Sequence, residues 1–272
     1  MSQIVQAGRY KFKITRNIQE FRGQTLIHTY KIGGADLSDC VNISYIYENN
    51  NPKRAKIPHL LYEPECAVGT TLERGGGTEI MIKTLLRYAF NEVPSVSYFE
   101  FEDNSHIDCI DKNLTDAPPR KPKKPLNLAY FFIAYHGMTW YEARFNATMI
   151  DKTKYKLYKE KVKFLTEAKP GFELFLNIIG SALSSAEEAT YLEKLYNKTA
   201  TYREFFESIP KTKRCLVLYS WLNTFMEHYL SSSFSSSGWV ININNMDKPG
   251  QMVGGTRRAL YKIFSYRAIQ SL

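Results

Sequence analysis

Three consecutive glycines stand directly before a stretch with helical periodicity, in the run Arg74-Gly75-Gly76-Gly77-Thr78. Glycines let the backbone approach a ligand closely, and the first amide groups of a helix attract negative charge. Thr78 is expected to cap the helix, and Arg74 adds a positive charge beside it. The run therefore predicts an anion-binding site.

Two common phosphate-binding motifs do not describe this loop. It lacks the G-x-x-x-x-G-K-[ST] pattern of a Walker loop. The chain before it alternates like an antiparallel strand, whereas a dinucleotide fingerprint belongs to a βαβ unit. The alternative interpretation is a tight connection from strand to helix without any ligand.

Basic segments elsewhere indicate a second kind of chemistry. The chain has 272 residues, with 36 Lys and Arg against 27 Asp and Glu, and its net charge of +9 favours anionic partners. One basic run is Arg120–Lys124, and a second contains Tyr155 and Tyr158. The lysines of the second run are Lys152, Lys154, Lys156, Lys159, Lys161 and Lys163. Lysines beside aromatic rings suit phosphate contact and base stacking, so nucleic acid or an acidic surface is one candidate partner, and a solvated surface is the alternative.

Histidines and cysteines predict neither a metal centre nor a catalytic triad. The histidines are scattered, and the four cysteines (Cys40, Cys66, Cys109 and Cys215) form no CxxC pair. The first residues contain no apolar segment after a basic start, so no secretory signal is expected, and the cysteines are expected as reduced thiols in a cytoplasmic compartment. Because no run of about 18 apolar residues occurs, no membrane-spanning helix is expected.

The elements around the glycine loop follow from alternation and helical spacing. Strands are expected over 9–16, 24–32, 40–47 and 55–63, mostly antiparallel. Pro58 implies an edge, a bulge or a splay in the last of them, since proline cannot donate to the ladder. A helix is expected over 78–90, and residues 95–102 return to alternation.

The second half of the chain is expected to be mainly helical. An exposed loop over 111–125 precedes a helix from Leu126 that ends at Gly137, and Thr139-Trp-Tyr-Glu142 has the form of a capping box. The later sequence predicts helices over 151–230, a short strand at 239–243 and a basic helix at 256–269. The expected fold is α+β, with a mixed, mostly antiparallel sheet in residues 1–150 and a mainly helical region over 151–272.

The order of strands, glycine loop, helix, strand and tyrosine-bearing helix resembles the GNAT N-acetyltransferase family over roughly residues 8–150. That family carries (Q/R)-x-x-G-x-(G/A) at the loop, and here Arg74-Gly-Gly-Gly77 matches its start while Glu79 takes the place of the last Gly or Ala. The stretch Trp140-Tyr141-Glu142-Ala-Arg-Phe145 resembles the family's later Y-E-x-x-G-F element.

The resemblance implies an α+β acyltransferase domain that uses acetyl-coenzyme A and an unknown amine acceptor. The residues implied to hold the pyrophosphate are Arg74, Gly75, Gly76, Gly77, Thr78 and Lys83. Glu100, Glu102 or Glu63 would be the base that deprotonates the amine, and Tyr141 would protonate the departing thiolate. Glu79 and Lys83 are four residues apart, so Lys83 is expected to neutralise the extra carboxylate.

Two other classes of protein stay open at this point. A non-catalytic scaffold or virion structural protein with a GNAT-like fold fits the departures from the motif, and the lysine- and asparagine-rich sequence resembles proteins of large DNA viruses. A nucleic-acid-associated protein fits the basic runs.

Overall fold

Eight strands form one sheet in the order β1-β2-β3-β4-β5-β6-β10-β9 in the computed structural model. The structure describes residues 1–21, 24–33, 39–49, 51–107, 109, 125–230, 234 and 238–248. The strands are β1 (Ser2–Ala7), β2 (Tyr10–Phe21), β3 (Gln24–Gly33), β4 (Asp39–Glu48), β5 (Asn51–Leu60), β6 (Tyr98–Phe101), β9 (Thr148–Met149) and β10 (Trp239–Asn242). All neighbours pair antiparallel except β5 and β6, which are parallel, so the expected α+β fold is confirmed.

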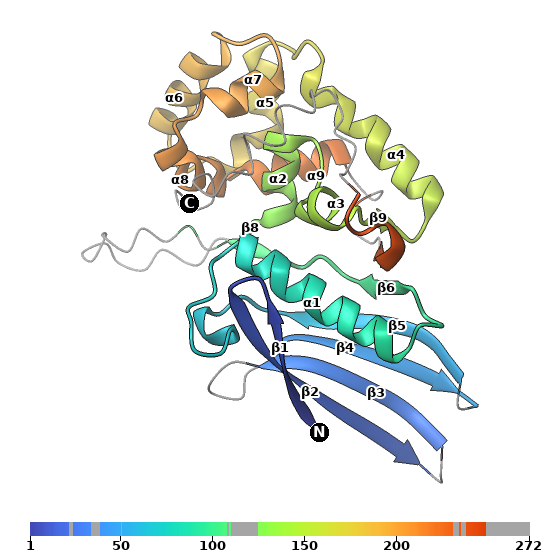
Figure 1. Cartoon of the computed structure of the whole chain (residues 1–272). Helices are drawn as coiled ribbons and strands as arrows, with labels where there is room; N and C mark the ends of the chain where they lie inside the picture. Colours follow the sequence, from blue (N-terminus) through green and yellow to red (C-terminus); the bar gives the residue numbers. More distant parts are fainter. Residues whose placement is uncertain are drawn as a thin grey trace. The chain divides into compact units, whose positions relative to one another are not determined.

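Alternation along the strands builds the core of this sheet. Tyr10, Phe12 and Ile14 of β2 are fully or almost fully buried, and their intervening lysines are exposed. Helix α1 (Gly76–Glu92) lies along one face of the sheet (Figure 1) and buries Ile82, Leu85 and other apolar side chains there. The helix at 78–90 is therefore confirmed, with a start two residues earlier.

The crossover through α1 joins the only parallel pair among the described strands, β5 and β6. These strands share just two paired positions, Ala55 with Phe99 and Lys56 with Glu100. Opposite β4, the register of β5 shifts so that Ile57 and Pro58 face the single residue Ile43. Pro58 therefore sits in a bulge, and the C-terminal half of β5 runs beyond its pairing with β6.

The rest of the described chain contains eight further α-helices. They are α2 (Leu128–His136), α3 (Trp140–Phe145), α4 (Lys152–Val162), α5 (Phe172–Ile179), α6 (Ala186–Tyr196), α7 (Tyr202–Ser208), α8 (Arg214–Tyr219) and α9 (Leu222–Leu230). Phe175, Phe225 and Trp221 are fully buried at the centre of an aromatic core, with ring centroids 5.4–6.0 Å apart. Asn127 caps α2, and Gly137 ends it in the left-handed conformation, as the sequence predicts for that end.

The chain divides into two compact units that are discontinuous in sequence. The sheet unit contains Met1–Glu102, Arg144–Ile150 and the segment that begins at Gly238, and the helical unit contains Asp103–Ala143 and Asp151–Ser237. The division expected from the sequence was a single boundary at residue 150. The short strand expected at 239–243 is β10, and it pairs inside the sheet with β6 and β9.

The expectation of reduced thiols is wrong. Cys40 is bonded to Cys66 in the sheet unit, and Cys109 is bonded to Cys215 in the helical unit. The residues of each pair are 26 and 106 positions apart in sequence, so spacing gave no sign of the pairing. Strand β4 places Cys40 beside the connection that leads to the glycine loop, where Cys66 ends a short 3₁₀ helix (Pro64–Cys66).

Three expectations concern residues outside the described part of the chain. They are the basic run Arg120–Lys124, most of the loop over 111–125, and the basic helix at 256–269. Within the described residues, no helix combines the length and apolar character that crossing a bilayer requires.

Candidate functional site

The glycine loop adopts a conformation that explains two of its three glycines. Gly75 is the N-cap of α1 at φ 77° and ψ −85°, a region that favours glycine, so the N-cap expected at Thr78 is wrong. A Cβ on Gly77 would lie 2.9 Å from Leu72 Cδ1 and 3.2 Å from the Tyr10 hydroxyl oxygen. Gly75 is therefore required by the turn and Gly77 by close packing beneath the helix.

Glu79, in the first turn of α1, is neutralised from two sides. Lys83 Nζ lies 2.8 Å from its Oε1, which is the pairing expected from their spacing. Arg144 donates from Nη1 to the other carboxylate oxygen at 2.9 Å. Arg144 lies 65 positions further along the chain, in α3, and no local sequence signal identifies it as a partner of Glu79.

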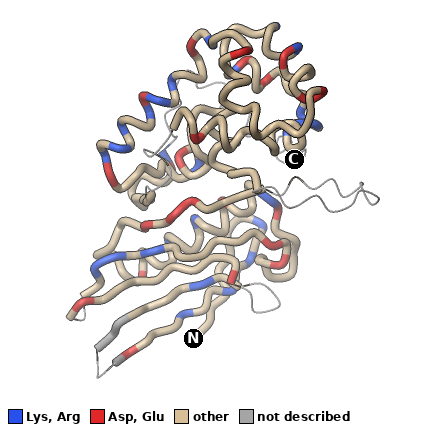
Figure 2. The backbone as a smooth tube through the Cα atoms, turned by 180° about the vertical axis from the view of Figure 1, so that it is seen from behind, with Lys and Arg blue, Asp and Glu red and all other residues tan. Residues whose placement is uncertain are grey.

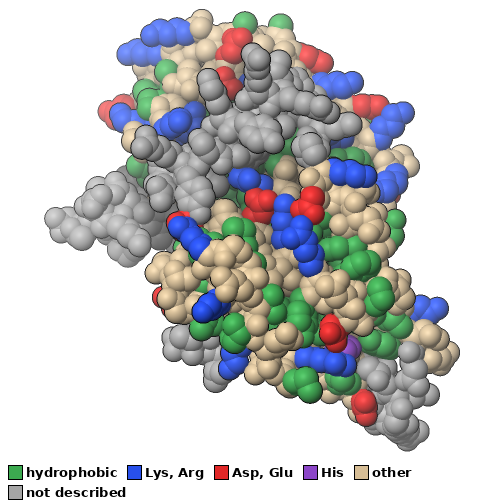
Figure 3. Space-filling model, in the orientation of Figure 1, with side chains coloured by type: hydrophobic (Ala, Val, Ile, Leu, Met, Phe, Trp, Pro, Cys, Tyr) green, Lys and Arg blue, Asp and Glu red, His purple; other side chains and the backbone are tan. Residues whose placement is uncertain are grey.

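The network continues along α1 through Asp247. Lys83 Nζ is also 3.4 Å from Asp247 Oδ1, and Arg87 Nη2 is 2.7 Å from Asp247 Oδ2. The charges of Arg87 and Lys83 hold the pKa of Asp247 below its ordinary value, although burial acts in the opposite direction. Basic and acidic side chains likewise lie next to one another on the face shown in Figure 3.

The connection before the glycine loop is fastened at several points. The Cys40–Cys66 disulfide ties it to β4, and the Val68 amide donates to the Lys11 carbonyl at 2.7 Å. The Tyr62 hydroxyl donates to the Leu72 carbonyl at 2.9 Å, and the exposed Arg74 guanidinium lies 5.6 Å from the centre of the Tyr62 ring. Arg74 is thus held next to the N-terminus of α1 with its charge open to solvent.

The candidate bases are spread over the sheet unit. Glu100 is half-buried on β6, between Lys56 of β5 and Val240 of β10 in the register. Glu102 is exposed just after β6, and Glu63 is half-buried just before the 3₁₀ helix Pro64–Cys66. Of these three carboxylates, only Glu100 belongs to a residue of the β5–β6 register, in which it pairs with Lys56.

Tyr141 belongs to the helical unit and is buried in α3 beside Trp140, with ring centroids 5.0 Å apart. Burial raises the pKa of its hydroxyl well above the ordinary value, and the nearby charge of Asp103 raises it further. Such a hydroxyl holds its proton more tightly than an exposed tyrosine, which makes it a weaker acid toward a thiolate.

Glu142 is the centre of a polar network that the sequence only partly revealed. It completes the expected capping box, since it accepts from the Thr139 amide at 2.8 Å while its own amide donates to Thr139 Oγ1 at 3.2 Å. Tyr155, Tyr158 and Lys159 of α4 also donate to its carboxylate, at 3.0, 2.7 and 3.2 Å. The carboxylate is buried, so it joins α3 to α4 through three charge-assisted hydrogen bonds.

This network changes the interpretation of the second basic run. Figure 2 shows lysines along α4. Lys159 is bound to Glu142, and Lys161 donates to the Leu230 carbonyl at 3.3 Å. Tyr158 is fully buried, so it offers no surface for base stacking, whereas Lys156 and Lys163 are exposed.

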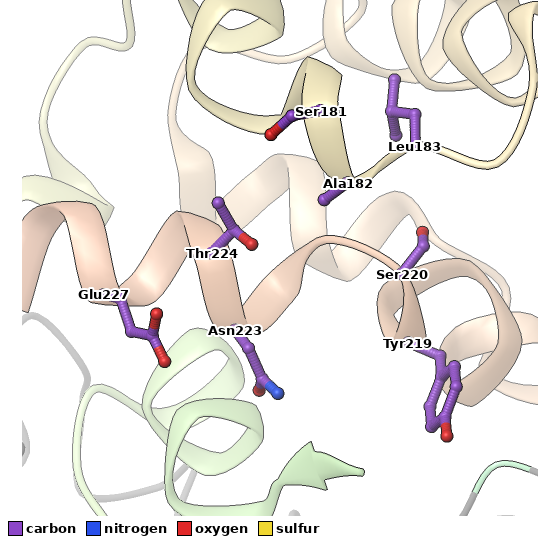
Figure 4. Close-up of a pocket in the computed structure, with 8 residues that line it drawn as sticks. All are labelled: Ser181, Ala182, Leu183, Tyr219, Ser220, Asn223, Thr224 and Glu227. Atoms are coloured by element: carbon purple, nitrogen blue, oxygen red, sulfur yellow. The ribbon is translucent and has the colours of Figure 1, made fainter. Parts of the chain in front are cut away.

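A pocket of about 340 Å³ lies in the helical unit, between the turn at Ser181–Leu183 and α9. Figure 4 shows Thr224 directed toward that turn, whereas Asn223 and Glu227 are directed away from it. Asn223 is already bonded to the Pro125 carbonyl and the Asn127 amide. The polar groups of the pocket therefore do not converge on a ligand.

Comparisons with known proteins found no match: no family model, no curated protein and no solved structure is significantly similar to the chain. Over the described residues, no group of three or more histidine, cysteine, aspartate or glutamate side chains is placed to hold a metal ion.

Proposed function

We propose that the chain is an acyl-coenzyme A dependent N-acyltransferase, with the cofactor bound at the N-terminus of α1. Three features of the sheet unit support this function. The glycine turn opens a helix of 17 residues, the helix connects a parallel strand pair, and the C-terminal half of β5 pairs with β4 but not with β6. An anionic pyrophosphate fits a helix N-terminus because of its free amides and its dipole.

The observation that carries the proposal is the neutralisation of Glu79. A free carboxylate one turn into the helix would repel pyrophosphate by about 1 kcal/mol in water and by more where solvent is excluded. Lys83 and Arg144 both lie within 3 Å of this carboxylate, so the first turn of α1 keeps a net positive surrounding. Arg74, exposed beside the loop, supplies the charge that faces an incoming anion.

The remaining roles follow from chemistry. The amides of Gly75, Gly77 and Thr78 would hold the pyrophosphate, whereas the Gly76 amide donates to the Arg74 carbonyl at 3.1 Å. Lys83 would act through Glu79 instead of touching the cofactor. Glu100 is the proposed base because it lies on the strand that follows α1, at Lys56, the last position at which β5 pairs with β6. An amine acceptor must lose a proton before it attacks a thioester, and a carboxylate in direct or water-mediated reach performs that step.

A non-catalytic protein with the same fold is the second candidate. It is favoured by the burial of Tyr141 and the raised pKa of its hydroxyl, which suit a core residue better than a proton donor. It is also favoured by Gly77, whose missing Cβ is explained by packing against Leu72 and Tyr10 without a ligand. In this case the loop would be a structural connection only.

Calorimetric titration with acetyl-coenzyme A, followed by an assay of coenzyme A release with a panel of amines, separates the two candidates. Pantetheine, which lacks the pyrophosphate, is the control ligand. Binding of acetyl-coenzyme A with release of thiol supports the acyltransferase, binding without turnover supports the non-catalytic protein, and absence of binding contradicts the proposed site. Glu100→Gln should lower turnover and leave cofactor affinity unchanged.

A further inference from the structure

Strand β1 forms an outer edge of the sheet and pairs on one side only, with β2. The Arg16 amide donates to the Met1 carbonyl at 2.8 Å, and the Met1 amino group donates to the Arg16 carbonyl at 3.3 Å. Facing residues of an antiparallel pair alternate between those that exchange backbone hydrogen bonds and those that do not. Counted from this bonded pair, Gln3, Val5 and Ala7 direct their backbone groups toward β2.

The other residues of β1 direct their N–H and C=O groups away from β2. They are Ser2, Ile4 and Gln6, and no described residue forms a hydrogen bond with these outward backbone groups. Strand β2 confirms the alternation, because the carbonyl of Lys11, which faces Gln6, accepts from the Val68 amide and not from β1. Ser2, Ile4 and Gln6 are also exposed, so β1 presents a row of unpaired donors and acceptors to solvent.

The side chains of this edge lack the usual protection against pairing. Edge strands of soluble proteins commonly carry charges or proline, which prevent another strand from adding to the sheet. Strand β1 has the sequence SQIVQA, without a charge, a proline or a glycine. The Gln3 side chain accepts from Tyr88 of α1 at 3.1 Å, so its neighbour Ile4 lies on the opposite face of the sheet, where it is 52% exposed. An apolar side chain thus lies in water at the middle of an unprotected edge.

We propose that β1 pairs with β1 of a second copy of this chain, antiparallel about a two-fold axis next to Ile4, so that the two sheets join. In this register Ile4 faces Ile4 of the second copy, and Ser2 faces Gln6 of the second copy. All three outward residues then exchange backbone hydrogen bonds, whereas any other antiparallel register leaves at least one of them outside a bonded pair. The two Ile4 side chains pack on each other, and both copies use the same surface, as a two-fold dimer requires.

The distribution of charge fits a second copy as the partner. An uncharged edge offers no ion pair to an acidic or basic peptide, and Arg9, in the turn after β1, is already paired with Glu73. The chain carries a net charge of +9, so two copies repel each other where their basic side chains meet. Lys13 of β2 lies beside Ile4 in the register, so the two copies of Lys13 would be three strand spacings apart, about 14 Å. This distance exceeds the Debye length of about 8 Å at physiological salt, so the repulsion between them is screened.

A dimer held by one strand pair should dissociate on dilution, because it buries less surface than the roughly 1,600 Å² of a standard interface. Analytical ultracentrifugation of the full chain over a range of concentrations measures this equilibrium, and the wild type should change from monomer to dimer as the concentration rises. Ile4→Lys places a charge on the edge and should weaken dimerisation about tenfold or more. The matched control is Ile18→Lys, which should dimerise like the wild type. Ile18 is an isoleucine of β2 that is 46% exposed and lies beyond the residues that pair with β1.

Two cysteine variants test the register. Facing residues of a bonded antiparallel pair have Cα atoms about 5.5 Å apart, which is within the range of a disulfide. Ile4→Cys should therefore form a disulfide between two copies under mild oxidation, as seen by electrophoresis without reductant. Gln6→Cys faces Ser2 of the second copy, so it should form much less cross-linked dimer. The four native cysteines are bonded in pairs, so the added thiol is the one that reacts.

Hydrogen exchange followed by NMR supplies a measurement on the wild type. The amides of Ile4 and Gln6 should exchange fast at low concentration and slowly at high concentration. The amides of Gln3 and Val5 should exchange slowly at every concentration, because they are bonded to β2. Slow exchange of Ile4 and Gln6 at low concentration would overturn the proposal, since the edge would then be paired within one chain.

Three further results would overturn the proposal: a monomer at every concentration, a dimer that Ile4→Lys does not weaken, or equal cross-linking by the two cysteine variants. Ile4→Lys replaces no residue of the proposed cofactor site. Dimerisation and the binding of acetyl-coenzyme A therefore fail or stand separately.

Discussion

Single charged residues at the start of α1 decide whether the glycine loop can hold an anion. The Glu79 carboxylate is paired with Lys83 from the same helix and with Arg144 from α3. The first partner could be predicted, because Glu and Lys four positions apart face each other on a helix. The second could not, since only the folded chain brings residues 79 and 144 together.

Replacing Lys83 by glutamine should weaken acetyl-coenzyme A binding about three- to tenfold, on the order of 1 kcal/mol. The reason is that Glu79 would keep only Arg144 as a partner and would repel the pyrophosphate. Calorimetric titration measures the change, with Arg87→Gln as the matched control because Arg87 touches Asp247 but not Glu79. Equal affinities of the wild type, Lys83→Gln and Arg87→Gln for acetyl-coenzyme A would mean that the pyrophosphate binds elsewhere.

His28 carries a prediction about pH. Its Nε2 lies 2.6 Å from Arg16 Nε, which can only donate, so the ring is neutral in the folded chain. Burial, helped by the charge of Arg16 and opposed by that of Glu92, lowers its pKa below the ordinary value of 6.5. The unfolded chain therefore binds a proton that the folded chain does not, and stability should fall as pH drops below 6.5.

Urea denaturation at pH 7.5 and at pH 5 measures this effect. His28→Gln should lose less stability than the wild type between the two pH values, whereas His59→Gln, at an exposed position of β5, should lose as much as the wild type. An identical pH dependence in His28→Gln would show that the histidine is not responsible.

At the scale of elements, local sequence patterns predicted individual strands and helices better than they predicted contacts between residues distant in sequence. Alternation of apolar and polar residues predicted β2 to β5, and helical spacing predicted α1. The pair Thr139 and Glu142 predicted the capping box. Local patterns did not predict β1, whose six residues pair with β2. They also did not predict that residues of α4 bind Glu142. They also placed Thr78 at the N-cap, because threonine is a common cap, although the backbone needed the positive φ of Gly75.

Two capping boxes allow a matched comparison of element stability. Glu142 is buried and binds Tyr155, Tyr158 and Lys159, whereas Glu204 caps α7 at the surface. Glu142→Gln should lower the free energy of unfolding by about 2–4 kcal/mol, because Lys159 loses its counter-charge and the donors lose an anionic acceptor. Glu204→Gln should cost less than about 1 kcal/mol. Similar losses in the two variants, measured by urea denaturation, would contradict the buried network.

At the scale of the whole molecule, the two units interleave in sequence, and each is closed by one disulfide. Cysteine spacing revealed neither bond, because pairing depends on distance in the fold. Both bonds should stabilise the chain, by about 3 kcal/mol for the shorter loop and by more for the longer one, since they restrict the unfolded state. Disulfides of this kind are typical of chains that mature in an oxidising environment.

Mass spectrometry after alkylation in denaturant checks the state of the cysteines. Without a reductant, the purified chain should take up no alkyl group, and after reduction it should take up four, one for each cysteine. Reduction should also lower the melting temperature. Uptake of four groups without reduction would restore the interpretation of free thiols.

The most direct test of the proposed function is calorimetric titration of the native chain with acetyl-coenzyme A. The glycine turn, the N-terminus of α1 and the neutralised Glu79 predict one bound molecule per chain, with a dissociation constant on the order of 10 μM. Arg74→Gln should weaken this binding and pantetheine should not bind. Absence of binding at about 1 mM acetyl-coenzyme A, or full binding by Arg74→Gln, would contradict a cofactor site at the glycine loop.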